Sequence, residues 1–435
     1  MKKLLLFIAL IVHLSANAQP AHRIRIGEVS IGDPSLKLKL VSRIQHYNDH
    51  TLSNLDYFDV AINSPKSAHI IEQTDSSGKV SKHLYINNLE GGTTSIYDVN
   101  NKFINIGQIN HTFAAQDSSL FKETDFPGYA FKAQKKHPNN FMGKPVEMCT
   151  SNNGKYLWIP YYRRDYDLLA TEPSALALID VDSNKIIRVF PTAPLPKMVT
   201  CSPDNKYISV TNWGDNTVHL IDISSGDPAQ FHYSAHFVVD HKFDLNFTTP
   251  VDRDVVCGLC LRGTVFTPDS KYLFVGRFGG GGIAVFDVDN KVYLGTIFGT
   301  KTNVRHLVIQ GDYLYVSSNG DGFVERTRWK PMLDFILAGN KNKPYNIWQV
   351  VSTGKGARTI TLTNDGAYLF ATANEVSKIS IVRTADMKVI GTINADSYPV
   401  GMTIDSSNKY LIVTAQGRSN KGGNSVMIYQ IMRKE

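Results

Sequence analysis

A short phrase that ends in tyrosine recurs along this chain, and it constrains the fold more than any other feature. The clearest copies are residues 202–207 (SPDNKY) and 267–272 (TPDSKY). A phrase that returns along a chain indicates an array of one supersecondary unit. Degraded copies bring the number of units to seven and lie at residues 76–85, 151–156, 310–313, 363–368 and 405–410.

The spacing of the closing tyrosines gives the size of the unit. The shortest spacings, from Tyr272 to Tyr313 and from Tyr368 to Tyr410, are 41 and 42 residues. This period is typical of a four-stranded propeller blade. The third unit shows segments of strand length and composition at residues 196–201, 207–212 and 217–223. We therefore expect an all-β fold, a seven-bladed β-propeller of four-stranded antiparallel blades.

The two ends of the chain are predicted to meet in the last blade. The seventh unit stops after its third strand, residues 425–431, whereas residues 36–45 are strand-like and belong to no unit. An N-terminal strand that completes the final blade removes the exposed sheet edges of an open array. Residues 19–435 are thus expected to form one domain.

Two recurring polar patterns are interpreted as structural. The Pro-Asp pair suits a turn, because proline presets φ and aspartate hydrogen-bonds to nearby backbone. Third strands end in an aspartate between apolar residues, at Asp98, Asp180, Asp222 and Asp287. A carboxylate at a strand end usually caps backbone N–H groups. We do not expect these aspartates to be catalytic.

Residues 1–18 have the pattern of a secretion signal. Lys2 and Lys3 precede the apolar run 4–14, and Ala16-Asn17-Ala18 is a small-x-small cleavage site. The mature chain is expected to begin at Gln19, without a lipid anchor or a transmembrane segment, in the periplasm or outside the cell. A formal net charge of +7 over 435 residues is too small to predict nucleic-acid binding.

Four cysteines in an oxidising compartment can pair in three ways, and their spacing does not choose among them. They are Cys149, Cys201, Cys257 and Cys260. Cys257 and Cys260 have CxxC spacing, but Leu261 stands where covalent haem attachment needs histidine, and no second CxxC completes a zinc site. A thiol pair or a local disulfide is expected, not a metal or a cofactor.

The repeats resemble the YVTN-type family of seven-bladed propellers, which includes YncE-like and surface-layer-like exported proteins. The family phrase joins a Ser-Pro-Asp turn to an Ile-Asp-Val strand, and residues 196–212 and 261–276 match it best. Unit five lacks the Pro-Asp turn, units five to seven lack the Ile-Asp-Val ending, and unit one is irregular. The resemblance implies the fold and leaves the function open, since propellers carry many unrelated activities.

The first position of each inner strand carries a cation in four consecutive units. In a closed propeller these side chains ring one mouth of the central channel, on a face that we call the top, and their potential attracts an anion. Glu147 and His306 follow this ring by one position, so strand alternation turns them away unless a bulge intervenes. The first positions of units two to seven are Val146, Lys197, Arg262, Arg305, Arg358 and Val400.

The loops between second and third strands lie on the same face and mix aromatic, cationic and amide side chains, as a recognition surface does. The alternatives are that each cation pairs with a neighbouring acid and that Trp213 and Tyr162 wedge between blades. The residues predicted to bind a ligand are Lys197, Arg262, Arg305, Arg358, Arg163, Arg164, Trp213, Asn216, Arg277 and Asn319.

Three insertions interrupt the units. Those near residues 112–143 and 228–256 lie between blades and are expected to project from the top face. The second carries His232, His236, Asp240 and His241, whose spacing suits a metal if it is helical, although surface or packing roles are favoured. The third, near 329–346, splits unit five and is predicted to contain an amphipathic helix over 331–337 that contacts a partner or covers the bottom of the channel.

Three functions remain open. The first is a binding or scaffold module of the cell envelope that recognises an anionic small molecule, a glycan or an envelope protein. The second is a lactonase-like hydrolase, which needs a general base near the ring. The third is a structural surface or adhesion protein, which needs a broad exposed apolar patch. The binding module is favoured, and no cofactor, metal or catalytic residue is assigned.

Overall fold

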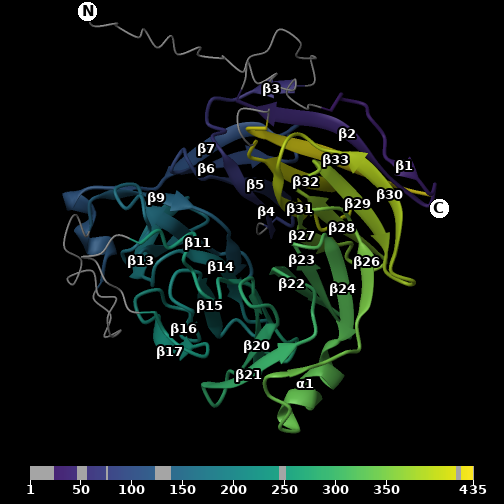
Figure 1. Ribbon diagram of the computed structural model, residues 1–435. Helices are drawn as coiled ribbons and strands as arrows, with labels where there is room; N and C mark the ends of the chain where they lie inside the picture. The colour runs from purple at the N-terminus through teal and green to yellow at the C-terminus, as the bar shows by residue number, and fades with distance from the viewer. Residues whose placement is uncertain are drawn as a thin grey trace, which may run out of the picture.

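Seven antiparallel sheets stand in a ring, so the chain is a seven-bladed β-propeller, as its repeats predict (Figure 1). The computed structural model describes residues 24–46, 56–74, 77–122, 139–243, 251–417 and 423–434. The proposed signal segment, residues 1–18, lies outside these ranges. No helix among the described residues is long and apolar enough to cross a membrane.

Blades one to three follow the repeat units in order. Blade two has its inner strand in two pieces, β9 and β10, which both pair with β11. The strands of these blades are β4 (Pro65–Thr74), β5 (Val80–Asn88), β6 (Thr93–Asp98) and β7 (Ile104–Asn110); β9 (Phe141–Pro145), β10 (Cys149–Ser151), β11 (Tyr156–Arg164), β12 (Ala175–Asp180) and β13 (Lys185–Pro191); and β14 (Pro196–Cys201), β15 (Tyr207–Asn212), β16 (Thr217–Asp222) and β17 (His232–Val238).

Blades four and six each add a short fifth strand at the outer edge, blade five has four strands, and blade seven takes its fourth strand and a short fifth from the N-terminal segment. Their strands are β18 (Leu261–Phe266), β19 (Tyr272–Arg277), β20 (Ile283–Asp287), β21 (Val292–Phe298) and β25 (Lys343–Pro344); β22 (Val304–Gln310), β23 (Tyr313–Ser318), β24 (Phe323–Arg328) and β26 (Gln349–Ser352); β27 (Ala357–Leu362), β28 (Tyr368–Ala373), β29 (Lys378–Arg383), β30 (Lys388–Asn394) and β1 (Ile31–Gly32); and β31 (Pro399–Ile404), β32 (Tyr410–Ala415), β33 (Ser425–Arg433), β2 (Leu36–Gln45) and β3 (Asp56–Phe58).

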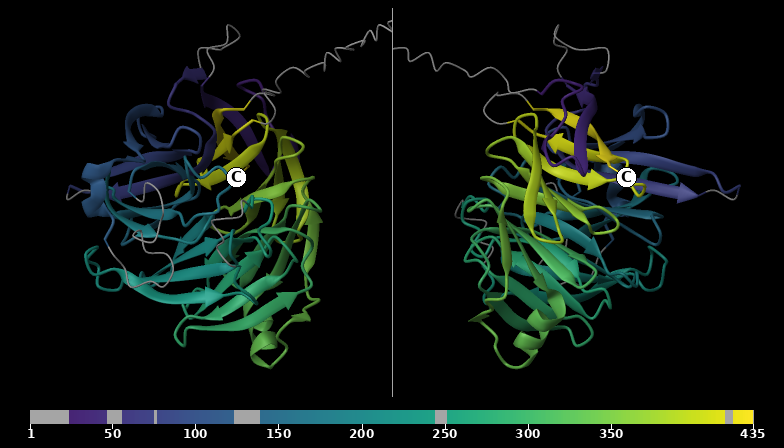
Figure 2. Two further views of the ribbon diagram at one scale, coloured as in Figure 1. Left: turned by 60° about the vertical axis from the view of Figure 1, so that its left-hand side comes forward. Right: turned by 90° about the vertical axis from the view of Figure 1, so that its right-hand side faces the viewer.

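The predicted closure by the N-terminal strand is confirmed. β2 pairs with β33 in antiparallel register from Leu36 opposite Arg433 to Gln45 opposite Ser425. Figure 2 shows this purple strand beside the yellow C-terminal strands. Backbone hydrogen bonds between β2 and β33 therefore join the two ends of the array and close the ring.

The recurring hydroxyl-Pro-Asp phrase is a hydrogen-bonded turn. The Ser202 hydroxyl donates to the Asp204 carboxylate at 2.7 Å and accepts the N–H of Tyr207 at 2.9 Å. Thr363 makes the same pair of bonds with Asp365 and Tyr368, at 2.6 and 3.1 Å. These contacts tie the first strand of a blade to the second, which explains why the phrase recurs.

The aspartates at the ends of third strands cap backbone amides, as predicted. Asp180 accepts the N–H of Ser183 at 2.9 Å, and Asp287 accepts the N–H of Asn290 at 2.8 Å. Their carboxylates hold the turn into the fourth strand. They therefore have a structural task at the periphery of the molecule.

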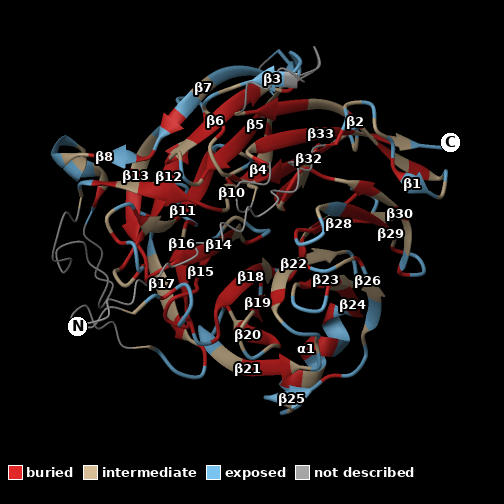
Figure 3. Cartoon of the chain, turned by 45° about the horizontal axis from the view of Figure 1, so that its top comes forward, coloured by how far each residue is buried: buried red, intermediate tan, exposed pale blue. Residues whose placement is uncertain are grey.

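The hydrophobic core is divided among the seven interfaces between neighbouring blades. Each interface buries one apolar cluster. Between blades two and three, for example, Trp158 and Phe190 pack with Val199 and Val210. Figure 3 shows the inner and middle strands as buried, whereas outer strands such as β7 and β25 are largely exposed. This arrangement leaves the residues nearest the axis free to be polar.

The insertions differ from the sequence prediction in their details. The range 228–256 includes β17, the fourth strand of blade three, so only the part after Val238 is inserted. His232 and His236 lie on this strand, so the helical spacing considered for a metal site does not exist. In the described part of the chain no three His, Cys, Asp or Glu side chains form a group that could hold a metal ion.

The helix of blade five is present but does not cover the channel. It is α1, Trp329–Leu337, between β24 and β26. Met332, Leu333 and Ile336 are buried in the cluster between blades four and five, because the apolar face of the helix packs against β21 and β24. Since β21 is an outer strand, α1 lies at the rim of the propeller (Figure 1). The prediction that it covers the bottom of the channel is therefore wrong.

Candidate functional site

A left-handed residue opens the inner strand of six blades. It stands two positions before the predicted ring position and has φ between 48° and 80°. Such values are costly for residues with a side chain, by about 1–2 kcal/mol each. Their repetition shows that the chain turns sharply before it enters each inner strand. The six residues are Ser64, Leu195, Cys260, Asn303, Gly356 and Tyr398.

A β-bulge follows this turn and places the ring side chain. The register between first and second strands shifts at Lys197, between Pro196 and Met198, and at Arg305, between Val304 and His306. A bulge inserts an extra residue and re-aims its side chain. The same shift occurs at Lys66 of blade one. We call the seven residues at this position the axial ring: Lys66, Val146, Lys197, Arg262, Arg305, Arg358 and Val400.

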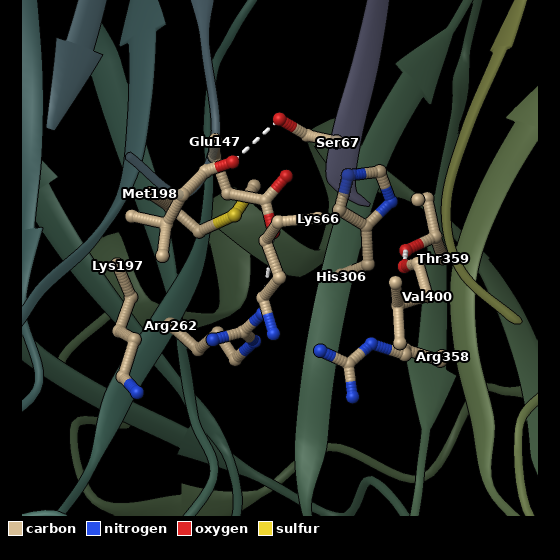
Figure 4. Close-up of polar contacts among 12 residues, drawn as sticks. Lys66, Ser67, Glu147, Lys197, Met198, Arg262, His306, Arg358, Thr359 and Val400 are labelled. Carbon is tan, nitrogen blue, oxygen red and sulfur yellow. Dashed lines mark hydrogen bonds and ion pairs between the residues drawn. The ribbon is translucent and has the colours of Figure 1, made fainter. Parts of the chain in front are cut away.

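Hydroxyl groups of neighbouring blades hold the backbone of the ring. Thr211 donates to the carbonyl of Arg262 at 2.8 Å, and Ser317 donates to that of Arg358 at 2.5 Å. Ser67 binds the carbonyl of Val146 in the same way, at 2.5 Å (Figure 4). Each bond joins the first or second strand of one blade to the ring position of the next, so the ring positions are held relative to one another.

Five of the seven ring residues are cations, and they act on one another. Burial lowers the pKa of Lys66 well below its usual value, and the charges of Arg358, Arg262, Lys197 and Arg305 lower it further. Figure 4 shows the charged ends of Lys66, Lys197, Arg262 and Arg358 turned to the same side. The four cations predicted from the sequence are therefore brought together. Lys66 was missed, because unit one is irregular.

Lys197 is fully engaged by its neighbours. Its ammonium group lies 3.1 Å from a carboxylate oxygen of Asp254, 3.8 Å from the ring centroid of Tyr162 and 4.8 Å from that of Trp213. Burial lowers its pKa to about 7, although Asp254 opposes the shift. Asp254 belongs to the second insertion, which thus reaches the ring.

Arg262 is the other paired member, and its partner was predicted to point away. Glu147 Oε1 lies 3.3 Å from the guanidinium of Arg262. Glu147 falls in the gap between β9 and β10, where the inner strand of blade two is interrupted. Strand alternation does not apply across such a gap, so the side chain turns to the ring instead of away from it.

Arg305 and Arg358 have no carboxylate partner among the described residues. Neither Nε atom has a hydrogen-bond acceptor there. The guanidinium of Arg305 lies 5.4 Å from the ring centroid of Phe278, and that of Arg358 lies 5.8 Å from that of Tyr398. Burial and the charge of Arg262 lower the pKa of Arg358 to about 10, although Tyr398 and the charge of Glu147 oppose the shift. Arg358 is 3% exposed, so an uncompensated charge there is costly.

His306 lies beside the ring as a neutral group. Its Nδ1 accepts the N–H of Ile360 at 3.4 Å, which leaves the proton of the neutral ring on Nε2. Burial, together with the charges of Arg262 and Arg305, lowers its pKa to about 4. At neutral pH His306 therefore adds a polar group and no charge.

Arg163 and Arg164 do not join the ring. Arg163 donates to the carbonyl of Leu168 at 2.5 Å and lies over the ring of Tyr162. Arg164 is 1% exposed, bonds to the Tyr166 hydroxyl at 3.1 Å and stacks on Phe141. Both contribute to the packing of blade two.

The other predicted side chains fasten the loops around the ring. Trp213 donates to the carbonyl of Asp254 at 3.2 Å and Asn319 to that of Ala357 at 3.1 Å, while Arg277 pairs with Asp240 at 3.1 Å. Asn216 bonds to the backbone of His241 and Leu259, at 3.0 and 2.8 Å. The alternative interpretation of Trp213 as a packing residue is therefore the better one.

The cysteines divide into a disulfide and a thiol pair. Cys257 and Cys260 are bonded and buried under Trp213 in the loop that carries Asp254. Cys149 and Cys201 are thiols packed against the same apolar cluster between blades two and three. Burial raises the pKa of the Cys201 thiol to about 12, so it is unreactive as a nucleophile.

Comparison with known proteins identifies the fold and nothing narrower. No family model and no curated protein matches this chain. The propeller domain of Cps50 (Swd1) from Myceliophteria thermophila is similar in structure, with a TM-score of 0.54, 12% identity, and coverage of 85% of this chain and 97% of that one.

Kuenenia stuttgartiensis hydrazine synthase matches more weakly, with a TM-score of 0.45, 18% identity, and coverage of 73% of this chain and 83% of that one. A further 1245 chains are similar, out of 1247, so the fold is too widespread to indicate an activity.

Proposed function

We propose that this chain is an exported binding propeller that recognises a small polyanion at the axial ring. The proposal includes the signal segment 1–18, a location in the periplasm or outside the cell, and kinship with the YVTN-type propellers. One observation carries it: five cations meet on the axis with only two carboxylates, Glu147 and Asp254, in ion-pair contact with them among the described residues.

The uncompensated cations gather on one side of the ring. Blades three and four have paired cations, Lys197 and Arg262, whereas blades five, six and one carry Arg305, Arg358 and Lys66. Gathering like charges in a buried site costs free energy that a bound anion returns. Guanidinium groups bind carboxylate and phosphate oxygens in a bidentate way, so a ligand with two or more negative charges suits this side.

Calorimetric titration at low salt tests the proposal with tripolyphosphate, citrate, inorganic phosphate and acidic oligosaccharides. At least one polyanion should bind the wild type, and Arg305→Gln/Arg358→Gln should weaken that binding at least about a hundredfold, because each charge-assisted hydrogen bond contributes about 1.5–3 kcal/mol. The control Lys271→Gln/Lys291→Gln removes the same charge from exposed turns of blade four and should bind like the wild type. If both double variants weaken polyanion binding equally, the binding is nonspecific electrostatic attraction and the proposed site is refuted.

A lactonase-like hydrolase is a second candidate, favoured by the position of Glu147. A carboxylate 3.3 Å from Arg262 is a possible general base beside an anion site. Hydrolysis of a panel of lactones by the wild type and its loss in Glu147→Gln would support this activity. Binding without turnover would favour the binding module, and an envelope protein as partner remains the alternative if no small anion binds.

A further inference from the structure

Lys66 differs from the three buried cations of the axial ring. It is the bulged residue of β4 and, like Arg305, it is half-buried, whereas Lys197, Arg262 and Arg358 are buried. Its ammonium nitrogen contacts Gln416 Oε1 at 3.4 Å, and no carboxylate forms an ion pair with it among the described residues. Gln416 is itself held by Ser64 at 2.8 Å. The amine is thus oriented, and no carboxylate neutralises its charge among the described residues.

The groups that face Lys66 come from every blade of the ring that bears a charge. Arg262, Arg305, Arg358 and Lys197 surround it with positive potential. The nearest acids are engaged elsewhere, Asp254 with Lys197 and Glu147 with Arg262. His306 is neutral.

Burial and these cations lower the pKa of Lys66 well below the ordinary lysine value, with burial as the larger cause. A lysine answers such an environment differently from an arginine, because it can release its proton. Placing a lysine beside another cation is one of the ways in which enzymes produce a neutral, nucleophilic amine.

We propose that Lys66 forms an imine with an anionic carbonyl compound, of the 2-oxo acid class, whose carboxylate is held by Arg305 and Arg358. This inference rests on the anion site proposed above and adds the chemical class of the ligand. The amine nitrogen attacks the carbonyl carbon and forms a C–N bond, and the carbonyl oxygen leaves as water with the two amine hydrogens. The step needs no oxidant or reductant.

Lys197 is a poorer candidate for the same step. Its ammonium group is enclosed by Asp254, Tyr162 and Trp213, and the residue as a whole is 8% exposed. The carboxylate stabilises the protonated form, and the two rings block the approach of a carbonyl carbon. The comparison makes Lys197 an internal control for Lys66.

Reductive trapping tests the proposal. The purified protein is incubated at pH 7 with pyruvate or 2-oxoglutarate and sodium cyanoborohydride, which delivers hydride to an imine carbon, and the modified lysines are mapped by mass spectrometry. Labelling at Lys66 should exceed that at exposed Lys271 at least about tenfold, since each unit by which a lysine pKa falls raises its neutral fraction tenfold. Tripolyphosphate should suppress the labelling of Lys66, and the Arg305→Gln/Arg358→Gln variant should show at least about tenfold less of it.

Two further results separate this inference from the proposed function. Lys66→Arg should lose the label at this site, and tripolyphosphate binding is measured separately by calorimetry on the wild type. If tripolyphosphate binds the wild type but Lys66 is labelled no more than Lys271 or Lys197, the imine is refuted and the anion site stands. If neither a polyanion nor a 2-oxo acid binds at the ring, both proposals fail.

Discussion

Two buried arginine sites in this propeller are built in opposite ways. Where the ring closes, Arg43 of β2 binds Asp396 through Nε at 2.7 Å and through a terminal nitrogen at 2.9 Å. Asp396 also accepts bonds from the Ser425 hydroxyl, at 2.7 Å, and from the N–H of Ile24, at 3.1 Å. On the axis, Arg358 is equally buried, but no carboxylate accompanies it among the described residues.

The difference separates a structural role for Arg43 from the binding role proposed for Arg358. A buried ion pair with every oxygen satisfied connects the N-terminal strand to blades six and seven, so its task ends with folding. A buried cation without an anion costs stability, and the cost is tolerated where a ligand supplies the missing charge. The closure is therefore complete as it stands, whereas the axial ring has the charge imbalance on which the proposed anion binding rests.

The largest effect is expected at the closure. Arg43→Met leaves Asp396 buried without its counterion and should lower the free energy of unfolding by about 3–5 kcal/mol in urea titrations. Arg25→Met, at an exposed arginine of the same segment, should change it by less than about 0.5 kcal/mol. Equal stability of the two variants would show that the buried pair does not hold the ring closed.

The same substitution on the axis should not lower the free energy of unfolding. Arg358→Met removes a cation that is repelled by Arg305 and Arg262, so in phosphate-free buffer the free energy of unfolding should stay level or rise by up to about 2 kcal/mol. The same urea titrations, compared with those of Arg43→Met, measure it. A loss as large as that of Arg43→Met would mean that the contact between Arg358 and Tyr398 holds the fold, and the contrast between the two sites would disappear.

Removing an acid from the ring should strengthen anion binding. Glu147→Gln deletes one of two negative charges near the ring and keeps the shape of the side chain, so affinity for the best polyanion should rise about tenfold, or about 1.4 kcal/mol. Calorimetry at low salt measures the change, and Glu90→Gln, at the outer pair with Lys144, is the control. Unchanged affinity in Glu147→Gln would place the bound anion away from Arg262.

The smallest effect is a pH dependence at Lys197. Burial lowers its pKa to about 7, so between pH 7 and about 10 the unfolded state holds a proton that the folded state has released. Stability therefore increases with pH in this window. The destabilisation caused by the buried, charged Lys197 is fully present below pH 7. The free energy of unfolding of the wild type minus that of Lys197→Met should rise by about 1 kcal/mol from pH 7 to pH 8, whereas Lys271→Met should give a constant difference.

The repeat phrase was enough to predict the blades, the turns and the closing strand. Tyr207, Tyr272, Tyr368 and Tyr410 mark equivalent positions because the local hydrogen bonds of the turn need the same residues each time. The same register located Arg262, Arg305 and Arg358 at the axis. The helix α1 was also predicted in its range, but its place was not, because an amphipathic pattern says that one face is covered and does not say by what.

Lys66 and Glu147 are what sequence reasoning missed. Lys66 follows Pro65 as Lys197 follows Pro196, and this Pro-Lys pair was the available signal in an otherwise irregular unit. Glu147 carried no signal, since its direction depends on the interruption between β9 and β10. Arg164 was assigned to the site from its loop, although it stacks on Phe141, a contact across residues distant in the chain.

By itself, the sequence determined the number of blades, their order, the residues of their turns and the strand that closes the ring, because these follow from local hydrogen bonding and a period that repeats. Only the tertiary structure decided which charges meet without a partner. That outcome depends on bulges that re-aim Lys66 and Arg305, on the gap that turns Glu147 inward, and on the loop that brings Asp254 to Lys197. Charge balance is a property of the assembled ring, in which residues hundreds of positions apart share one buried space.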